Sequence, residues 1–220
     1  MNSTLIVLEG LDGSGKATQA RLLTDRLSGE GKTAKLISFP DYESKSSTLV
    51  QMYLAGEIGS LEQVNPFAAS SFYSLDRYIS YQTVWKDYYQ SGGTIVADRY
   101  TTSNLSHQMG KLPREKWEDY IAWLTDYEYR LLGLPEPSMV IYLDMHPEAS
   151  RLLLEERYQG RVHQTDLHED NLTYLLACRE AALFAAHRLN WHILTCSDEQ
   201  HRPVPVETVA RQVAALYEKR

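Results

Sequence analysis

A glycine-rich stretch near the start of the chain limits most strongly what this sequence can fold into. It follows an apolar run at residues 5–8, precedes a helical pattern at 19–27, and reads Gly10-Leu11-Asp12-Gly13-Ser14-Gly15-Lys16-Ala17-Thr18. A strand, a loop with the spacing G-x-x-x-x-G-K and a helix, in that order, are typical of a phosphate-binding P-loop. We therefore expect residues 10–18 to bind the phosphates of a nucleoside triphosphate, with Lys16 near the terminal phosphates.

The last position of this loop departs from the motif. Ala17 stands where Ser or Thr usually supplies a hydroxyl to magnesium, and Thr18 comes one residue too late. Two carboxylates are the candidates for holding the metal beside phosphates and water. Asp98 ends the apolar run 94–98, and Glu9 directly precedes the loop.

The composition excludes several other classes of protein. The 220 residues are 43% hydrophobic and carry 29 acidic against 22 basic side chains, a net charge of −7. No diffuse basic surface for nucleic acid is expected, and no apolar run is long enough to cross a membrane. The two cysteines do not make a disulfide framework, and the start of the chain lacks the basic residues of a secretory signal. We expect a cytoplasmic protein with buried thiols.

Strand and helix patterns alternate along the chain. The apolar runs predict strands at 4–9, 33–39, 94–98, 139–144 and 192–196. Helical patterns lie at 16–28, 47–55, 66–90, 114–132, 147–157, 170–189 and 206–218. This alternation predicts one domain spanning 1–220, with a three-layer α/β/α P-loop NTPase fold and a five-stranded parallel sheet. Ligands should gather at the carboxyl ends of the strands.

Three further groups of residues fall near those strand ends or on helices that face them. Asp98-Arg99 ends the third strand, where both side chains can reach a cleft. Tyr73 and Arg77 are spaced i, i+4 and share a helix face, so they could stack on a base and bond its edge, although packing explains such a pair equally well. Arginines at 151, 157 and 161 adjoin a polar segment, which predicts a helical lid at about 157–170 or a solvated loop.

Together these residues make the chain resemble the thymidylate kinase family over essentially its whole length. The resemblance rests on residues 9–19, on Phe39-Pro40, on Tyr73-Ser74-Leu75-Asp76-Arg77, on residues 98–104, on Tyr142-Leu143-Asp144 and on the arginine-bearing lid. It implies a kinase that uses ATP and Mg²⁺ to convert dTMP to dTDP by direct phosphoryl transfer.

The resemblance also implies a role for each site residue. Lys16, Asp98, Arg99, Arg157 and Arg161 would be catalytic, with the two lid arginines clamping the transferring phosphoryl group. ATP would contact residues 10–18 and Ser197, and the metal would lie near Asp98 and Glu9. The residues implied to bind dTMP are Asp12, Phe39, Tyr73, Arg77, Arg99, Ser103, Asn104 and His107.

Two departures from the family lie on the acceptor side. An arginine usually follows the Phe-Pro pair, whereas this chain has Asp41-Tyr42-Glu43-Ser44-Lys45, where Lys45 could substitute. His107 stands where many relatives carry a tyrosine beside the sugar. Two alternatives stay open: a kinase for another deoxynucleotide or a modified pyrimidine nucleotide, and a nucleotide-binding regulator without catalysis, which Ala17 motivates.

The resemblance implies a homodimer as well. Residues 65–90 and 117–129 offer apolar helix faces for such contacts, but the same faces could pack inside the protein.

Overall fold

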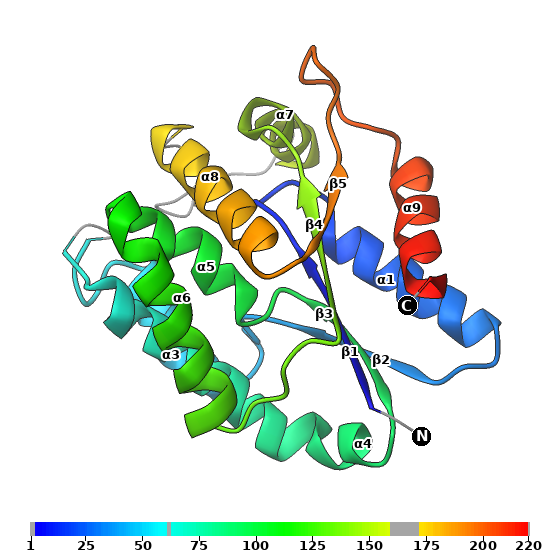
Figure 1. Cartoon of the computed structure of the whole chain (residues 1–220), viewed down its shortest axis with the longest axis horizontal. Coiled ribbons are helices and arrows are strands. Elements are labelled where there is room, and N and C mark those ends of the chain that lie inside the picture. Colours follow the sequence, from blue (N-terminus) through cyan, green and yellow to red (C-terminus); the bar gives the residue numbers. More distant parts are fainter. Residues whose placement is uncertain (1–2, 61–62, 159–171, 220) are drawn as a thin grey trace.

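One parallel sheet forms the centre of the protein, in a computed structural model that describes residues 3–60, 63–158 and 172–219. Its strand order is β2-β3-β1-β4-β5, and every neighbouring pair is parallel (Figure 1). The strands are β1 (Thr4–Glu9), β2 (Ala34–Ser38), β3 (Thr94–Asp98), β4 (Met139–Asp144) and β5 (His192–Thr195). Because β1 lies between β3 and β4, the carboxyl ends of all three meet at one edge.

Helices cover both faces of the sheet. One face is covered by α1 (Lys16–Gly29) and α9 (Val206–Glu218), which pack against each other (Figure 1). Among the described residues, the other α-helices are α2 (Thr48–Leu54), α3 (Pro66–Ser80), α4 (Lys86–Gln90), α5 (Thr102–His107), α6 (Trp117–Thr125), α7 (Pro147–Tyr158) and α8 (Leu172–Arg188). Of these, α3, α5, α6 and α8 lie on the opposite side of the sheet from α1. The expected three-layer fold is confirmed.

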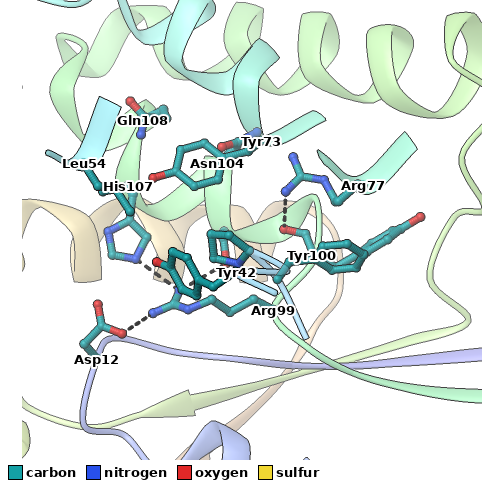
Figure 2. A pocket seen from close by; sticks show the side chains of 13 residues that line it. Asp12, Tyr42, Leu54, Tyr73, Arg77, Arg99, Tyr100, Asn104, His107 and Gln108 are labelled. Atoms are coloured by element: carbon teal, nitrogen blue, oxygen red, sulfur yellow. Dashed lines mark hydrogen bonds and ion pairs between the residues drawn. The ribbon is translucent and has the colours of Figure 1, made fainter. Parts of the chain in front are cut away.

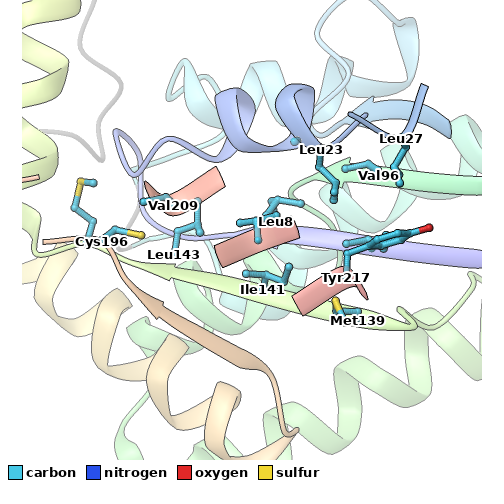
Figure 3. Close-up of a cluster of buried hydrophobic side chains, with 14 of the residues drawn as sticks. Leu8, Leu23, Leu27, Val96, Met139, Ile141, Leu143, Cys196, Val209 and Tyr217 are labelled. Atoms are coloured by element: carbon cyan, nitrogen blue, oxygen red, sulfur yellow. The ribbon is translucent and has the colours of Figure 1, made fainter. Parts of the chain in front are cut away.

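Alternate residues of β1 feed two separate cores. Ile6 and Leu8 pack with α1 and α9 in the core of Figure 3, whereas Leu5 and Val7 face an aromatic cluster that contains Trp85. Both sets are fully buried because successive side chains of a strand point to opposite faces. Burial of both faces explains why the strand is a continuous apolar run. Both cysteines are buried and unpaired, as expected.

Several elements differ from the sequence-based prediction. The predicted helix at 66–90 is interrupted by a π-helical turn, Tyr81–Trp85, which separates α3 from α4. Helix α5 was not predicted, since Thr102–His107 is polar and short. The predicted lid lies outside the described residues except for the end of α7. None of the described helices is long and apolar enough to cross a membrane.

Candidate active site

The P-loop connects β1 to α1 and leaves the amino end of that helix free for a ligand. Gly15 is the N-cap, with φ +88°, and no side chain in the described part of the chain caps the first N–H groups. A Cβ on Gly10 would lie 2.5 Å from Ser14 Oγ and 2.8 Å from the Leu143 carbonyl oxygen. Glycine at position 10 is therefore required by close packing, whereas glycine at position 15 allows a left-handed turn. Uncapped N–H groups at a helix start bind anions.

Lys16 lies at the base of this loop with its ammonium group held in place. The side chain is buried, and Nζ donates to the Leu11 carbonyl oxygen at 2.7 Å and lies 3.8 Å from Asp12 Oδ1. Burial, followed by repulsion from Arg99, lowers the pKa of Lys16 to about 8, against the opposing effect of nearby carboxylates. A phosphate bound here would favour the protonated, charged form of Lys16, which burial disfavours.

Asp98 ends β3 beside the P-loop and has an oxygen available for a ligand. Its Oδ1 is buried and has no hydrogen-bond partner among the described residues, and the side chain lines the same cleft as Lys16. An orphaned buried carboxylate oxygen is costly unless a cation or donor meets it. This environment fits a magnesium ion, which prefers oxygen ligands. Ala17 and Thr18 line the same cleft.

Glu9, the other expected metal contact, is instead surrounded by hydrogen-bond donors from the protein. The carboxylate is fully buried; Oε2 accepts from Thr102 at 2.7 Å and from Ser103 at 2.8 Å. Oε1 accepts from the Gly10 N–H at 2.9 Å and lies 3.5 Å from Arg99 Nη1. These bonds position the loop and the arginine, so the structure gives no support to Glu9 as a metal ligand.

Arg99 lies at the centre of the site. Its backbone has φ +67°, a conformation uncommon for residues with a side chain and typical of strained functional positions. The guanidinium donates to Asp12 Oδ1 at 2.6 Å and to Ser103 Oγ at 3.2 Å, and it lies 3.3 Å from His107 Nε2. Burial alone would lower the pKa of Arg99, but Asp12 and Glu9 raise it. Burial would likewise raise the pKa of Asp12, but Arg99 and Lys16 hold it well below its usual range.

A cavity of about 130 Å³ lies beyond Arg99, and Figure 2 shows it from close by. All eight residues expected to bind the acceptor line it: Asp12, Phe39, Tyr73, Arg77, Arg99, Ser103, Asn104 and His107. They come from segments as distant in sequence as the P-loop, α3 and α5. The structure therefore brings together every residue of this predicted set.

Arg77 is held at the wall of this cavity by a buried carboxylate. Its Nε and Nη2 donate to Glu128, at 2.8 and 2.5 Å, and Nη1 donates to the Tyr100 carbonyl oxygen at 3.3 Å. Both side chains of the ion pair are buried. Three of the five N–H groups are used in these bonds, so two remain for a ligand among the contacts of the described chain. The arrangement suits an arginine that presents a fixed pair of donors to a base.

A larger cleft of about 820 Å³ runs from the P-loop along α1 to the segment after β5. The predicted loop residues from Asp12 to Thr18 line it, whereas Gly10 and Leu11 are not among its lining residues. Its far wall contains Cys196 and the segment 203–206. Ser197, expected near the adenine, is the neighbour of Cys196, but its hydroxyl accepts from the His146 N–H at 3.1 Å. Arg161 lies outside the described residues, as does the side chain of Arg157.

The two cavities share part of their walls. The residues common to both are Asp12, Phe39, Pro40, Tyr42 and Arg99. A ligand phosphate in one cavity would therefore face a phosphate in the other across the Asp12–Arg99 pair. Direct phosphoryl transfer needs this end-to-end alignment of donor and acceptor.

Sequence reasoning missed some residues that build the site. Glu128 accepts from Arg77, Ser74, Thr101 and Asn104, and it organises one side of the acceptor cavity. Asp76 accepts from the Asp41 N–H at 3.0 Å and from Ser46 Oγ, which fixes the loop after Phe39-Pro40. The available signal was one charge inside an aromatic stretch, Tyr127-Glu128-Tyr129, which reads equally well as an exposed position.

A P-loop with a donor cleft that meets a separate acceptor cavity is the architecture of a nucleoside monophosphate kinase, and the chain is of that class. The family model described as "Thymidylate kinase" matches residues 8–203, and the chain belongs to the thymidylate kinase family. Thymidylate kinase of Schizosaccharomyces pombe is 32% identical over 158 residues, 70% of this chain and 69% of that protein. Thymidylate kinase of Mycobacterium tuberculosis is 29% identical over 161 residues, 73% and 72% of the two chains.

A solved structure supports the fold. Thymidylate kinase from Candida albicans superposes with a TM-score of 0.70 at 23% identity, over 99% of this chain and 92% of that one. The Candida albicans protein has a broad substrate specificity.

Proposed function

We propose that this protein phosphorylates dTMP to dTDP, with ATP and Mg²⁺, by direct in-line transfer. The shared wall of the two cavities at Asp12 and Arg99 is the observation that carries the proposal. Membership of the thymidylate kinase family supports dTMP as the acceptor. Phosphoryl transfer asks the protein mainly to align two nucleotides and to offset charge, which this arrangement can do.

The donor cleft would bind ATP through the loop amides and Lys16. Residues 12–18 line this cleft, and residues 10–18 would surround the phosphates. The adenine would lie toward the segment after β5, near Cys196 and Ser197. Asp98 would hold Mg²⁺, directly or through water, and the metal would supply charge neutralisation between the phosphates. Ala17 has no side-chain oxygen to offer, so Asp98, whose Oδ1 has no partner among the described residues, would have the greater share of that task.

The acceptor cavity would orient dTMP through three kinds of contact. Tyr73 would stack on the thymine, Arg77 would donate to its carbonyl edge, and Arg99 would bind the phosphate. Ser103 and Asn104 would lie near the base, with His107 and Asp12 beside the sugar. In the ligand-free arrangement Arg99 is paired with Asp12 at 2.6 Å, so the acceptor phosphate would compete with Asp12 for this guanidinium.

Four further parts of the proposal concern the whole molecule. Residues 1–220 form a single domain, and the segment at about 157–170 is a lid whose Arg157 and Arg161 stabilise the transferring phosphoryl group. The enzyme is a cytoplasmic homodimer that binds neither nucleic acid nor membranes. Exposed apolar side chains of α3, Leu75 and Ile79, support a helix-face contact between two copies.

A kinase for a different deoxynucleotide or a modified pyrimidine nucleotide is the second candidate. Lys45, which could have replaced the missing arginine, is exposed and does not line the acceptor cavity. The cavity also places His107 against Arg99 where many relatives have tyrosine. Both features lie on the acceptor side and leave ATP use unaffected.

A panel of acceptors distinguishes these candidates. ADP release from ATP and Mg²⁺ is measured with dTMP, dUMP, dCMP, dGMP, dAMP and UMP at equal concentrations. Highest kcat/KM with dTMP supports the proposal. A higher kcat/KM with another monophosphate means that the protein is a kinase for that nucleotide. ATP binding without transfer to any acceptor supports the nucleotide-binding regulator without catalysis.

A further inference from the structure

Two histidines and a glutamate form a cluster outside the residues that line the two cavities. His146 follows β4, Glu148 lies in the first turn of α7, and His201 lies in the loop after β5. One donor atom from each lies within 4.8 Å of the others. The imidazole rings of His146 and His201 are stacked, with centroids 3.7 Å apart and planes 11° apart. Three ligand-type side chains from two distant chain segments thus lie close together.

Several local bonds hold His146 and His201 in this arrangement. The His146 N–H donates to Ser197 Oγ at 3.1 Å, and the Glu148 N–H donates to His146 Nδ1 at 3.3 Å. His201 adopts φ +57°, and its N–H donates to the Asp198 carbonyl oxygen at 3.0 Å. A left-handed backbone at a residue with a side chain is uncommon and requires support from its surroundings. The two segments are therefore fixed so that the two rings face each other.

A carboxylate lies beside one of the two imidazoles. His201 Nε2 lies 3.7 Å from Glu148 Oε2, so a carboxylate already faces the second imidazole.

We propose that His146, Glu148 and His201 bind a divalent transition-metal ion of the zinc type. Two imidazoles and one carboxylate are a ligand set that suits Zn²⁺ and leaves a fourth position for water. Zinc–ligand bonds of about 2.0–2.2 Å place neighbouring ligands of a tetrahedral ion about 3.3 Å apart. Because the two rings are stacked nearly parallel, at least one imidazole must rotate before both ring nitrogens and the carboxylate can point at one ion. His201 and Glu148 are 42% and 52% exposed, which leaves both side chains room to rotate.

The position of this site suggests what a bound ion would do. Met145, beside His146, and Pro203, two residues after His201, both line the donor cleft. An ion bound by both segments would join the carboxyl end of β4 to the loop after β5. The site is separate from the magnesium expected at Asp98, and it adds a structural link to the wall of the donor cleft.

Titration of the nucleotide-free protein with ZnCl₂ tests the proposal by calorimetry and by the shift in melting temperature. His146→Ala removes one ligand. His201→Asn removes another and keeps a residue that tolerates the left-handed backbone. The matched controls are His187→Ala and His192→Ala, two exposed histidines outside the cluster. Asp98→Asn tests whether zinc enters the donor cleft instead.

The wild-type protein, the two matched controls and Asp98→Asn should each bind one Zn²⁺ at this site and should melt at a higher temperature when zinc is present. Each ligand variant should bind that ion at least about tenfold more weakly and lose the thermal shift. Unchanged zinc affinity in both His146→Ala and His201→Asn overturns the proposal. Loss of binding in Asp98→Asn alone, or no zinc binding by the wild-type protein, overturns it as well.

Discussion

The donor cleft and the acceptor cavity of this protein are built in opposite ways. In the donor cleft, of about 820 Å³, polar atoms such as Asp98 Oδ1 have no partner among the residues that the structure describes, and none of these residues caps the helix start at Gly15 with a side chain. In the acceptor cavity, of about 130 Å³, Arg77 and Arg99 are already bonded to the buried carboxylates Glu128 and Glu9. In the donor cleft, the hydrogen-bond and ion-pair partners must come from the ligand. In the acceptor cavity, the arginines are held in place by the protein before a ligand binds.

The difference follows from what each ligand brings. A triphosphate with its metal ion carries enough charge to satisfy exposed amides and Lys16, so the protein need not supply these partners itself. A mononucleotide must be distinguished by its base and sugar, which requires donors fixed in direction. Fixed donors avoid the entropy cost of ordering side chains on binding. The donor side thus provides charge and the acceptor side provides selection.

Removing the charge of the donor cleft should have the largest effect. Lys16→Ala should lower kcat by at least about 10³-fold, because the ammonium group stabilises charge that develops during transfer. Lys45→Ala is the matched control, since this exposed lysine lines neither cavity. The measurement is steady-state ADP release, with circular dichroism to verify folding. Near-normal turnover in Lys16→Ala would show that Lys16 of the P-loop does not contribute to phosphoryl transfer.

The site shows how far sequence reasoning reaches and where it stops. Gly10 and Lys16 were predictable, since motif spacing alone defines the loop, and β1 was predictable from its apolar run. The clustering of Tyr73, Arg77 and Asn104 followed from a resemblance to a family and not from local pattern. Glu128 was not predictable, because its partners are up to 54 residues away in sequence and only the folded chain brings them together.

Disrupting the acceptor cavity should affect stability as well as binding. Arg77→Met leaves Glu128 buried without its cationic partner, which should lower the free energy of unfolding by about 3–5 kcal/mol. Arg77→Met combined with Glu128→Gln should recover part of this loss, because no buried charge remains unpaired. Urea denaturation measures both. The two side chains do not act as a charge pair if the double variant loses as much free energy of unfolding as the two single variants together, or more.

The glycines of the P-loop should respond unequally to alanine. Gly15→Ala places a methyl group in open space and costs only the strain of a left-handed backbone, about 1–2 kcal/mol. Gly10→Ala should cost more, because the methyl group would also meet the Leu143 carbonyl oxygen at 2.8 Å. Denaturation midpoints of the two variants test this order. Equal losses would mean that close packing at Gly10 does not matter.

The smallest effect should be on the pH dependence of ATP binding. Lys16 has a pKa of about 8 in the ligand-free protein, and phosphates would raise it in the complex. Binding then takes up a proton above pH 8, so affinity should fall as pH rises, by at most about tenfold per unit. Calorimetry between pH 7 and 9.5 measures the trend. Lys16→Arg, whose side chain keeps its charge over this range, should bind ATP with no such pH dependence. An unchanged slope in this variant would mean that the proton taken up on ATP binding goes to a group other than Lys16.

Transfer of labelled phosphate tests most directly the claim that the two cavities act as one site. The protein is incubated with ATP labelled at the γ-phosphate, Mg²⁺ and dTMP, and the products are separated. We expect the label to appear in dTDP, in amounts equal to the ADP formed, and we expect Lys16→Ala to abolish its appearance. Label recovered as inorganic phosphate, with dTMP unchanged, would contradict it, because the cavities would then bind nucleotides without aligning them.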